Sequence, residues 1–259
     1  MAKLYDRADI YDLLENERRY QIVKRHWEWV LRGREVRTLL DVSIGSGNQT
    51  LPLAELGVRL YGSDLSGPML ERCEEKAARR GFSVDLRRGD FRRLDATFDD
   101  GAVFDCVAST GNSLPYVTNG EIPAVLAQMD RLVKPGGYLY VDLRNWDRIL
   151  ETKQRFYLYN PTFLDNGTRM NLVQVWDHHG DGSMTFNLLY TFEWENRIIQ
   201  KEIFEEHYFP LRRELLLQEL KRLGYGEIKL MCQPAFLDGV RPEEAEWYCV
   251  LARKQEASK

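Results

Sequence analysis

Cysteine is scarce in this sequence, and no two cysteines stand close together. The 259 residues contain four, each in a helix-like or strand-like segment: Cys73, Cys106, Cys232 and Cys249. This spacing excludes a zinc knuckle and a Cys-x-x-Cys redox pair, and it favours small buried hydrophobic residues. His178 and His179 fall in a predicted hairpin turn without a nearby set of partner ligands, so we predict no metal site.

Long apolar runs are also missing. No segment approaches the roughly 20 apolar residues that a membrane-spanning helix needs. The first twenty residues mix charged and aromatic side chains and contain no apolar core of a signal peptide. We therefore expect a soluble, cytoplasmic protein without a membrane partner.

An excess of positive charge is absent as well. The chain has 36 Lys and Arg against 40 Asp and Glu, which gives a formal net charge of −4. Nucleic-acid-binding proteins usually carry a basic footprint, so we expect no nucleic-acid partner. The arginine-rich stretch at 76–93 could meet phosphates, but interleaved acidic residues favour a solvated helix end and strand edge.

What the sequence does contain is an alternation of strand and helix patterns. Strands are predicted at 37–43, 58–64, 84–90, 103–109 and 137–144, with helices at 48–56, 66–80 and 121–133 between them. A helix is also predicted near 11–31, and a last helix at 211–224 precedes strands at 227–232 and 246–254. This order predicts an α/β fold with a doubly wound, mostly parallel, seven-stranded Rossmann-like sheet.

The pattern changes after Leu150. Three long β-rich runs are separated by the turn signals HHGDGS and ENR, which predicts an inserted antiparallel meander. We therefore divide the chain into an N-terminal helical segment (1–35), a core (36–150 and 209–255) and an insertion (151–208). The first and last of these are expected to cover the active site.

A glycine loop follows the first predicted strand in the stretch LLDVSIGSGNQTLPLAELG. Gly45 and Gly47 allow a ligand to approach the backbone closely, and Asp64 ends the next strand at a distance suited to both hydroxyls of a ribose. The dinucleotide fingerprint needs a third glycine, where this chain has Thr50. The pattern thus predicts a nucleoside ligand and disfavours an NAD-dependent dehydrogenase.

This loop resembles motif I of class I S-adenosylmethionine-dependent methyltransferases, with Ser43 in place of the usual first glycine. Gly-Asp-Phe at 89–91 resembles the adenine-binding position, and LVKPGG at 132–137 resembles the turn before the fifth strand. The resemblance implies S-adenosylmethionine as cofactor and a set of cofactor-binding residues: Asp41, Ser43, Gly45, Gly47, Asp64, Asp90, Phe91 and Ser109. Taken singly, the glycines and aspartates could equally be turn and helix-cap residues.

The segment after the fourth strand, STGNSLPYV, lacks the Asn/Asp-Pro-Pro-aromatic motif common in enzymes that methylate bases. A small acceptor is therefore favoured. Together with VDLRNWDRIL, this segment resembles the glycine N-methyltransferase and glycine/sarcosine N-methyltransferase family. That resemblance implies that Arg144 grips the substrate carboxylate, that Asn112 flanks it, and that Tyr11 and Tyr190 line the site. Tyr116 stands where the animal enzymes have histidine.

Several alternatives stay open at this level. Arg144 could form a surface salt bridge with Asp142 or Asp147 instead of facing open space opposite Asn112. The acceptor could be an amino sugar, a phenol or another metabolite, and the chain could be a non-catalytic nucleoside-binding module. The oligomeric state is open too, with a homo-oligomer among the possibilities.

Overall fold

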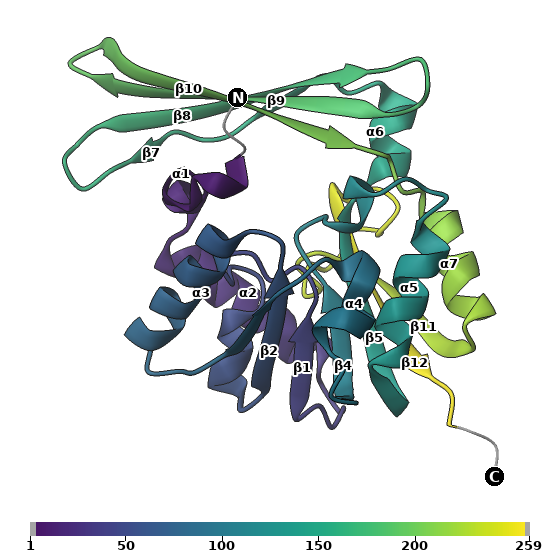
Figure 1. The fold of residues 1–259 in the computed structure, drawn as a ribbon. Coiled ribbons are helices and arrows are strands. Elements are labelled where there is room, and N and C mark those ends of the chain that lie inside the picture. The colour runs from purple at the N-terminus through teal and green to yellow at the C-terminus, as the bar shows by residue number, and fades with distance from the viewer. Residues whose placement is uncertain (1–3, 257–259) are drawn as a thin grey trace.

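The computed structural model describes residues 4–256 and contains two sheets, one above the other (Figure 1). The larger is built from β1 (Thr38–Asp41), β2 (Arg59–Asp64), β3 (Asp85–Arg88), β4 (Phe104–Ser109), β5 (Val133–Arg144), β11 (Tyr225–Cys232) and β12 (Trp247–Lys254). Its order is β11-β12-β5-β4-β1-β2-β3. The first five strands run parallel, and β12 lies antiparallel between β5 and β11. The predicted seven-stranded, mostly parallel sheet is thus confirmed.

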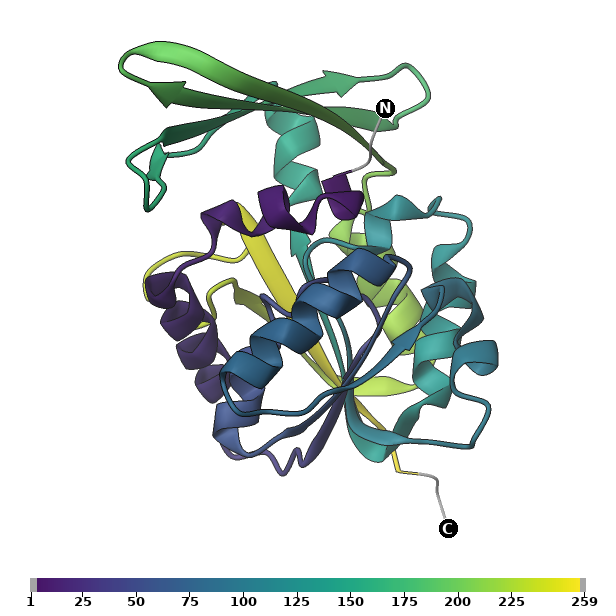
Figure 2. The same ribbon diagram turned by 60° about the vertical axis from the view of Figure 1, so that its left-hand side comes forward.

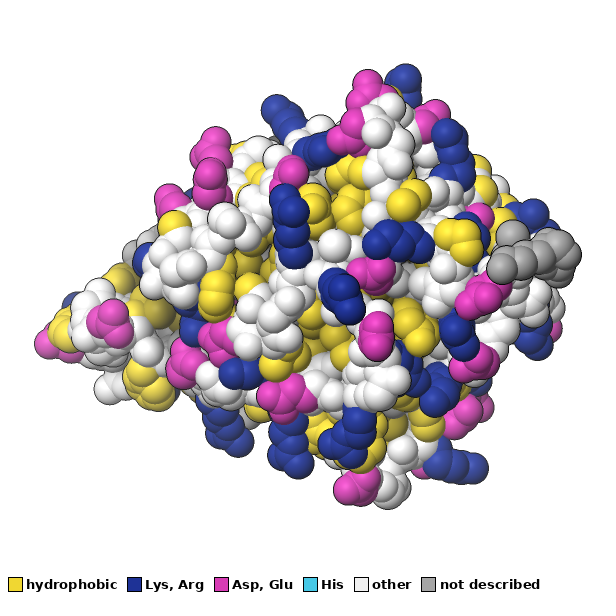
Figure 3. All heavy atoms as spheres, turned by 90° about the horizontal axis from the view of Figure 1, so that it is seen from below, with side chains coloured by type: hydrophobic (Ala, Val, Ile, Leu, Met, Phe, Trp, Pro, Cys, Tyr) yellow, Lys and Arg dark blue, Asp and Glu magenta, His cyan; other side chains and the backbone are white. Residues whose placement is uncertain are grey.

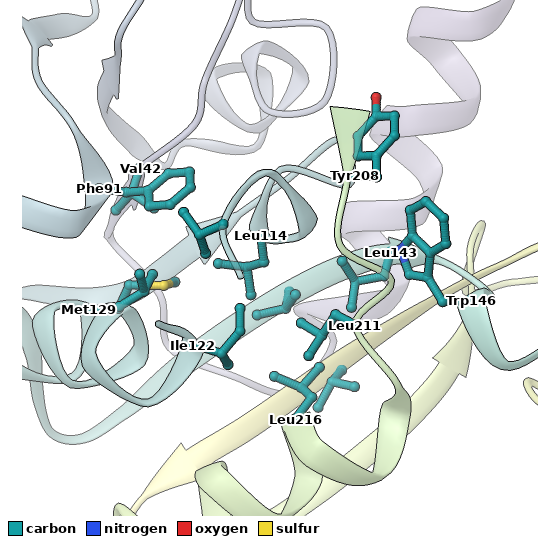
Figure 4. Packing of buried hydrophobic residues seen from close by; sticks show 14 of the residues in the cluster. Val42, Phe91, Leu114, Ile122, Met129, Leu143, Trp146, Tyr208, Leu211 and Leu216 are labelled. Atoms are coloured by element: carbon teal, nitrogen blue, oxygen red, sulfur yellow. The ribbon is translucent and has the colours of Figure 1, made fainter. Parts of the chain in front are cut away.

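Helices cover both faces of this sheet. α2 (Glu17–Val30) and α3 (Gly67–Arg79) pack on one face with apolar side chains of β1 and β2. α4 (Leu94–Thr97), α5 (Ile122–Arg131) and α7 (Arg213–Arg222) cover the other face. Figure 4 shows this second core, to which α5 contributes Ile122 and Met129, α7 contributes Leu216 and β5 contributes Leu143. Two buried layers therefore hold the parallel strands from both sides, as near-continuous apolar strands require.

Two predicted helices differ from the structure. Within the predicted helix 11–31, the short turn η2 (Asp12–Leu14) comes first and α2 begins only at Glu17, because the Asn16 side chain caps α2 by accepting from Arg19 N at 3.0 Å. Two short elements, η1 (Leu4–Asp6) and α1 (Ala8–Tyr11), precede it. The segment predicted as helix 48–56 is the 3₁₀ turn η3 (Leu51–Leu56). It follows the left-handed Gly47 (φ +81°), and its Pro52 has no N–H to donate.

The second sheet is the insertion. It contains β6 (Phe156–Leu158), β7 (Thr162–Phe163), β8 (Arg169–His178), β9 (Met184–Trp194) and β10 (Arg197–Tyr208), all antiparallel to their neighbours. α6 (Trp146–Thr152) connects it to β5. The predicted meander is confirmed, and β6 and β7 extend it beyond the prediction. Buried and exposed residues alternate along β8 and β9, so one face packs toward the core.

The start of the N-terminal segment, residues 4–14, lies between the insertion and the core, as both ribbon views show, whereas α2 packs beside the sheet (Figure 2). Residues 1–3 of the predicted segment 1–35 lie outside the described residues. The opposite end of the molecule, seen in Figure 3, carries Lys and Arg interspersed with Asp and Glu. Within 76–93, Arg80 pairs with Glu17, Arg87 with Asp100 and Arg92 with Asp90: these arginines face acidic partners of the same chain.

A buried histidine connects α2 to the sheet. His26 Nδ1 accepts from Ala235 N at 2.8 Å, and Nε2 lies 2.9 Å from the Tyr140 hydroxyl. Since Nδ1 is an acceptor, the neutral ring carries its proton on Nε2 and donates it to Tyr140. Burial lowers the pKa of His26 to about 4.

This histidine should make folding stability depend on pH. The unfolded chain, with a histidine pKa near 6.5, binds more protons between pH 6.5 and 4 than the folded chain does. The free energy of unfolding should therefore fall by up to about 3 kcal/mol as the pH drops through that window. Urea unfolding of the wild type and His26→Gln checks this. If the free energy of unfolding changed with pH to the same extent in the two proteins, this prediction would be contradicted.

Candidate functional site

A cavity of about 590 Å³ lies at the carboxyl ends of β1, β2 and β4. In open α/β sheets this edge is where ligands bind. The core supplies the glycine loop, 64–66, 89–92 and the segment after β4. The N-terminal segment adds Tyr5, Asp6 and Tyr11, and the insertion adds residues 205–207 of its edge strand β10. The cavity is thus floored by the sheet and closed by the two segments outside it.

The two glycines of the glycine loop have different roles, one at the cavity and one in packing. Gly45 (φ +54°) lines the cavity. Gly47 (φ +81°) does not line it, because it packs into the core: a Cβ there would lie 2.6 Å from Leu51 Cγ and 2.8 Å from Cys73 Sγ. Only glycine combines this backbone conformation with this close approach to η3 and α3.

Ser43, the residue that replaces the usual first glycine, has a structural role that its side chain makes possible. Its Oγ lies 3.2 Å from Ser109 Oγ and 3.2 Å from Thr110 O, and it accepts from Thr110 N at 3.1 Å. The hydroxyl therefore joins the loop after β1 to the loop after β4. Ser43 lines the cavity, whereas Ser109 is fully buried behind it.

Asp64 lies on the cavity wall at the end of β2. Its Oδ2 accepts from Gly45 N and its Oδ1 from Ser66 N, both at 2.9 Å. Burial raises its pKa, and these two backbone donors oppose that shift. The carboxylate is thus fixed between the glycine loop and the start of α3, in the position suited to hydroxyls of a ribose.

Asp41 is placed differently from the sequence-based expectation of direct contact. It is fully buried below the loop, accepts from Thr110 Oγ1 at 2.6 Å and Ser43 N at 3.1 Å, and does not line the cavity. Burial raises its pKa to about 6. Its geometry fits a support for both loops. Asp90 and Phe91, by contrast, lie on the wall at the end of β3, where the resemblance places adenine.

A cluster of tyrosines and one glutamate closes the far end of the cavity. Tyr116 OH lies 2.7 Å from Tyr5 OH and 2.8 Å from Tyr208 OH, and it donates to Glu206 Oε2 at 3.0 Å. Burial raises the pKa of all three tyrosines. Tyr11 packs against Tyr5 with ring centroids 5.7 Å apart. The cluster joins the N-terminal segment, the loop after β4 and β10.

Sequence reasoning missed Tyr5, Glu206 and Tyr208. The available signal was weak: Phe204, Glu206 and Tyr208 alternate on the last strand of the insertion, which places a carboxylate between two inward-facing aromatic residues. Tyr190 lies on the inner face of β9, buried against Phe204, and does not line the cavity.

Arg144 lies at the end of β5 under the insertion, not on the cavity wall. Its guanidinium carbon is 4.8–5.7 Å from the ring centroids of four aromatic residues: Tyr157, Trp176, Phe186 and Trp247. Nη2 makes long contacts to Tyr159 OH (3.4 Å) and Gln174 Oε1 (3.5 Å). Such a box of ring faces favours a cation.

The expected placement of Arg144 opposite Asn112 across open space is wrong. Asn112 is buried, and its Oδ1 accepts from Arg144 N at 3.1 Å and Trp146 Nε1 at 2.9 Å, so it fixes the backbone at the start of α6. The salt-bridge alternative is also not what the geometry shows: Asp147 pairs with Arg212, and Asp142 accepts from Gly111 N at 2.7 Å. Among residues 4–256, Arg144 has no carboxylate within 4 Å.

Comparison with known proteins identifies the core. Residues 39–137 match the family described as Methyltransferase domain. The solved structure of an S-adenosylmethionine-dependent methyltransferase from Clostridium acetobutylicum has a TM-score of 0.76 at 16% identity, covering 96% of this chain and 97% of that one. Residues 39–137 thus resemble a methyltransferase domain, and the chain as a whole shares the fold of that solved enzyme. The residues present fit the cofactor that the sequence predicts, S-adenosylmethionine, because Gly45, Asp64 and Phe91 lie around one cavity.

The similarity to some curated relatives extends beyond residues 39–137. The glycine/sarcosine/dimethylglycine N-methyltransferase of Actinopolyspora halophila is 26% identical over 94% of this chain, and the glycine/sarcosine N-methyltransferase of Aphanothece halophytica is 24% identical over 86%. The chain spans 40% of the first relative's length and 78% of the second's. Streptomyces venezuelae DesVI, with a TM-score of 0.74 at 20% identity, covers 96% of this chain, which itself covers 98% of DesVI. The fold likeness therefore includes the insertion.

Two further features of the chain bear on the sequence predictions. No helix within residues 4–256 has the length and apolar character needed to cross a bilayer. In the same part of the chain, no group of three or more His, Cys, Asp or Glu residues could hold a metal ion. His178 Nε2 lies 2.8 Å from Gln154 O, and His179 Nε2 lies 2.9 Å from Thr185 Oγ1. Both imidazoles therefore have ordinary hydrogen-bond partners.

Asp12 attaches the N-terminal segment to the glycine loop. Its Oδ1 accepts from Ser46 Oγ at 2.7 Å and Asn48 Nδ2 at 3.0 Å, and its Oδ2 accepts from Arg72 Nε at 2.9 Å, with Lys76 Nζ at 3.3 Å. Burial opposes ionisation of Asp12, but Lys76 and these donors outweigh it and lower its pKa. The carboxylate thus holds Tyr5 and Tyr11 over the cavity.

We expect Asp12→Asn to loosen this cover. Losing a charged acceptor from several buried donors should destabilise the fold by about 1–3 kcal/mol and speed the dissociation of S-adenosylmethionine several-fold. Stopped-flow binding and urea unfolding measure both effects. Asp9→Asn is the matched control, because Asp9 is exposed and pairs only with its neighbour Arg7. Identical dissociation rates in the two variants would contradict this role.

Proposed function

We propose that the chain transfers a methyl group from S-adenosylmethionine to the amine of a small carboxylated metabolite such as glycine or sarcosine. The observation that carries this proposal is the Arg144 guanidinium, which is buried under the insertion without a carboxylate within 4 Å among residues 4–256. A buried charge lacking a counter-ion is costly. A substrate carboxylate is the natural partner, since it accepts two parallel hydrogen bonds from a guanidinium.

Glu206, the carboxylate of the tyrosine cluster at the cavity end, supports the same proposal. Tyr208 is close enough to both residues that Glu206 raises its pKa and Arg144 lowers it. Tyr208 therefore lies within electrostatic reach of one positive and one negative side chain. An amino acid carries the complementary charges, with its ammonium suited to Glu206 and its carboxylate suited to Arg144. The names of the curated relatives agree with this acceptor class.

Methyl transfer depends mainly on the alignment of the acceptor nitrogen with the methyl group. Bound S-adenosylmethionine supplies an activated methyl group and a neutral thioether as leaving group. The protein residues hold the acceptor nitrogen in line with that methyl and exclude water, and orientation of this kind is a large catalytic contribution. The nitrogen must be unprotonated to attack. The rate should therefore rise with pH until the bound amine is neutral, and Glu206 is placed to receive the ammonium form.

A second candidate acceptor is an amino sugar. It is favoured by one specific observation: Arg144 does not line the cavity, whereas residues 205–207 of β10 do. An uncharged polyol bearing an amine could reach Glu206 without using the guanidinium. This candidate keeps the cofactor, the cavity and the in-line transfer, and changes only the role of Arg144.

Methyl transfer from labelled S-adenosylmethionine to a panel of acceptors tests the proposal. The panel holds glycine, sarcosine, other small amino acids, amino sugars and phenols at equal concentration. Label should appear in the amino acids. Label confined to amino sugars or phenols would contradict the proposed acceptor, and binding without any transfer would point to a non-catalytic nucleoside-binding module. We place the reaction in the cytoplasm, since all four cysteines are free and buried.

A further inference from the structure

The outer face of the insertion sheet carries a row of exposed and half-buried apolar side chains. Seven of the thirteen large apolar residues exposed among the described ones lie within 151–208, less than a quarter of the chain. Strand pairing aligns four residues into one row across the sheet: Leu158, Val173, Leu189 and Ile203. Phe156 and Phe163 lie on the same face, 63% and 70% exposed. In Figure 1 this face points away from the core.

Two charged residues flank this row on β10. Lys201 and Glu205 are two positions before and after Ile203, so strand alternation puts all three on the outer face. Neither Lys201 nor Glu205 has an ion-pair partner within 4 Å among residues 4–256. Elsewhere on this face opposite charges do pair, as Arg169 does with Glu193. The face thus presents an apolar centre with one unmatched charge of each sign.

We propose that this face binds a second copy of the chain about a two-fold axis that runs along the apolar row. Such an axis places Ile203 opposite Ile203 of the second copy. It also places each Lys201 opposite the other chain's Glu205, because the two charges lie at equal distances on either side of Ile203. The patch is therefore self-complementary, as a two-fold interface requires.

The size of the face suits a dimer. The 38 residues of its five strands, at about 4.8 Å by 3.3 Å each, give roughly 600 Å² per chain. Two chains together would bury about 1,200 Å², at the lower end of the range of about 1,200–2,000 Å² for stable interfaces. β10 also borders the cavity, so the contact would steady the strand that carries Glu206.

Sedimentation velocity of the full chain between 1 and 50 µM tests the proposal. We expect a dimer for the wild type and a monomer for Ile203→Glu, which puts like charges face to face across the axis. Lys201→Glu should weaken the dimer by about 10-fold or more, since like charges in an interface are strongly unfavourable. The double variant Lys201→Glu/Glu205→Lys should restore the dimer to within about 3-fold of the wild-type Kd.

The matched control is Val103→Glu, which adds the same charge at an exposed apolar residue outside the insertion. It should remain a dimer. Thermal unfolding of each variant establishes that it is folded. A wild-type chain that is monomeric at 50 µM would leave this face to some other partner and would overturn the proposal. So would a dimer that persists in Ile203→Glu, or a charge swap that fails to restore what Lys201→Glu loses.

Discussion

Arg144→Lys should reduce turnover by about 100-fold or more while changing the affinity for S-adenosylmethionine by less than about 1 kcal/mol. The substitution keeps the positive charge but removes the planar fork. A lysine ammonium cannot lie against four aromatic rings and also present two parallel donors to a carboxylate. The amine would then be held out of line with the methyl group. Steady-state kinetics with calorimetry of cofactor binding separates the two effects.

The control for this substitution is Arg212→Lys. Arg212 is exposed and pairs with Asp147 on the surface, so the same chemical change should leave turnover within about 2-fold. Unchanged amino-acid methylation by Arg144→Lys would contradict the role of the guanidinium. The amino-sugar acceptor would then become the better account.

Asp64→Ala should weaken binding of both S-adenosylmethionine and S-adenosylhomocysteine by about 1–3 kcal/mol. The carboxylate accepts from Gly45 N and Ser66 N, so its loss removes the predicted ribose acceptor and frees the glycine loop at the same time. Both nucleosides should be affected alike, because they share the ribose. Calorimetry measures the two affinities, and NAD should give no detectable heat.

Asp85→Ala is the matched control for Asp64. Asp85 lies at the opposite, amino-terminal end of β3 and is exposed, so its removal should leave both affinities unchanged. Equal losses in the two variants would mean that general destabilisation, not the ribose contact, explains the effect. Tight binding of NAD to the wild type would contradict the nucleoside assignment itself.

The cofactor half of the site could be predicted from sequence because its signals are local. Asp64 ends one parallel strand, Gly45 lies in the loop that follows another, and parallel strands end at one edge of the sheet. The same short motif allowed Gly47 to be recognised, but it did not indicate its packing role. Its packing against Cys73 depends on how α3 folds back over the loop, which no short motif records.

The acceptor half could not be predicted in this way. Tyr5 and Tyr116 are 111 residues apart, and Tyr116 and Glu206 are 90 apart. Their meeting depends on the register of the insertion strands, and a shift by one residue would turn Glu206 outward. The surroundings of Arg144 have the same origin, since Trp176 and Phe186 reach it from β8 and β9. Sequence pattern predicted that the insertion exists, but not which of its side chains point inward.

The ratio of kcat/KM for sarcosine to that for its amide tests the central claim most directly. The amide keeps the size and the nucleophilic nitrogen of the acceptor and removes only the carboxylate charge. If Arg144 holds that carboxylate, the acid should be preferred by about 100-fold or more, and Arg144→Lys should abolish most of the preference. Equal rates for acid and amide, or faster methylation of uncharged acceptors, would contradict the account.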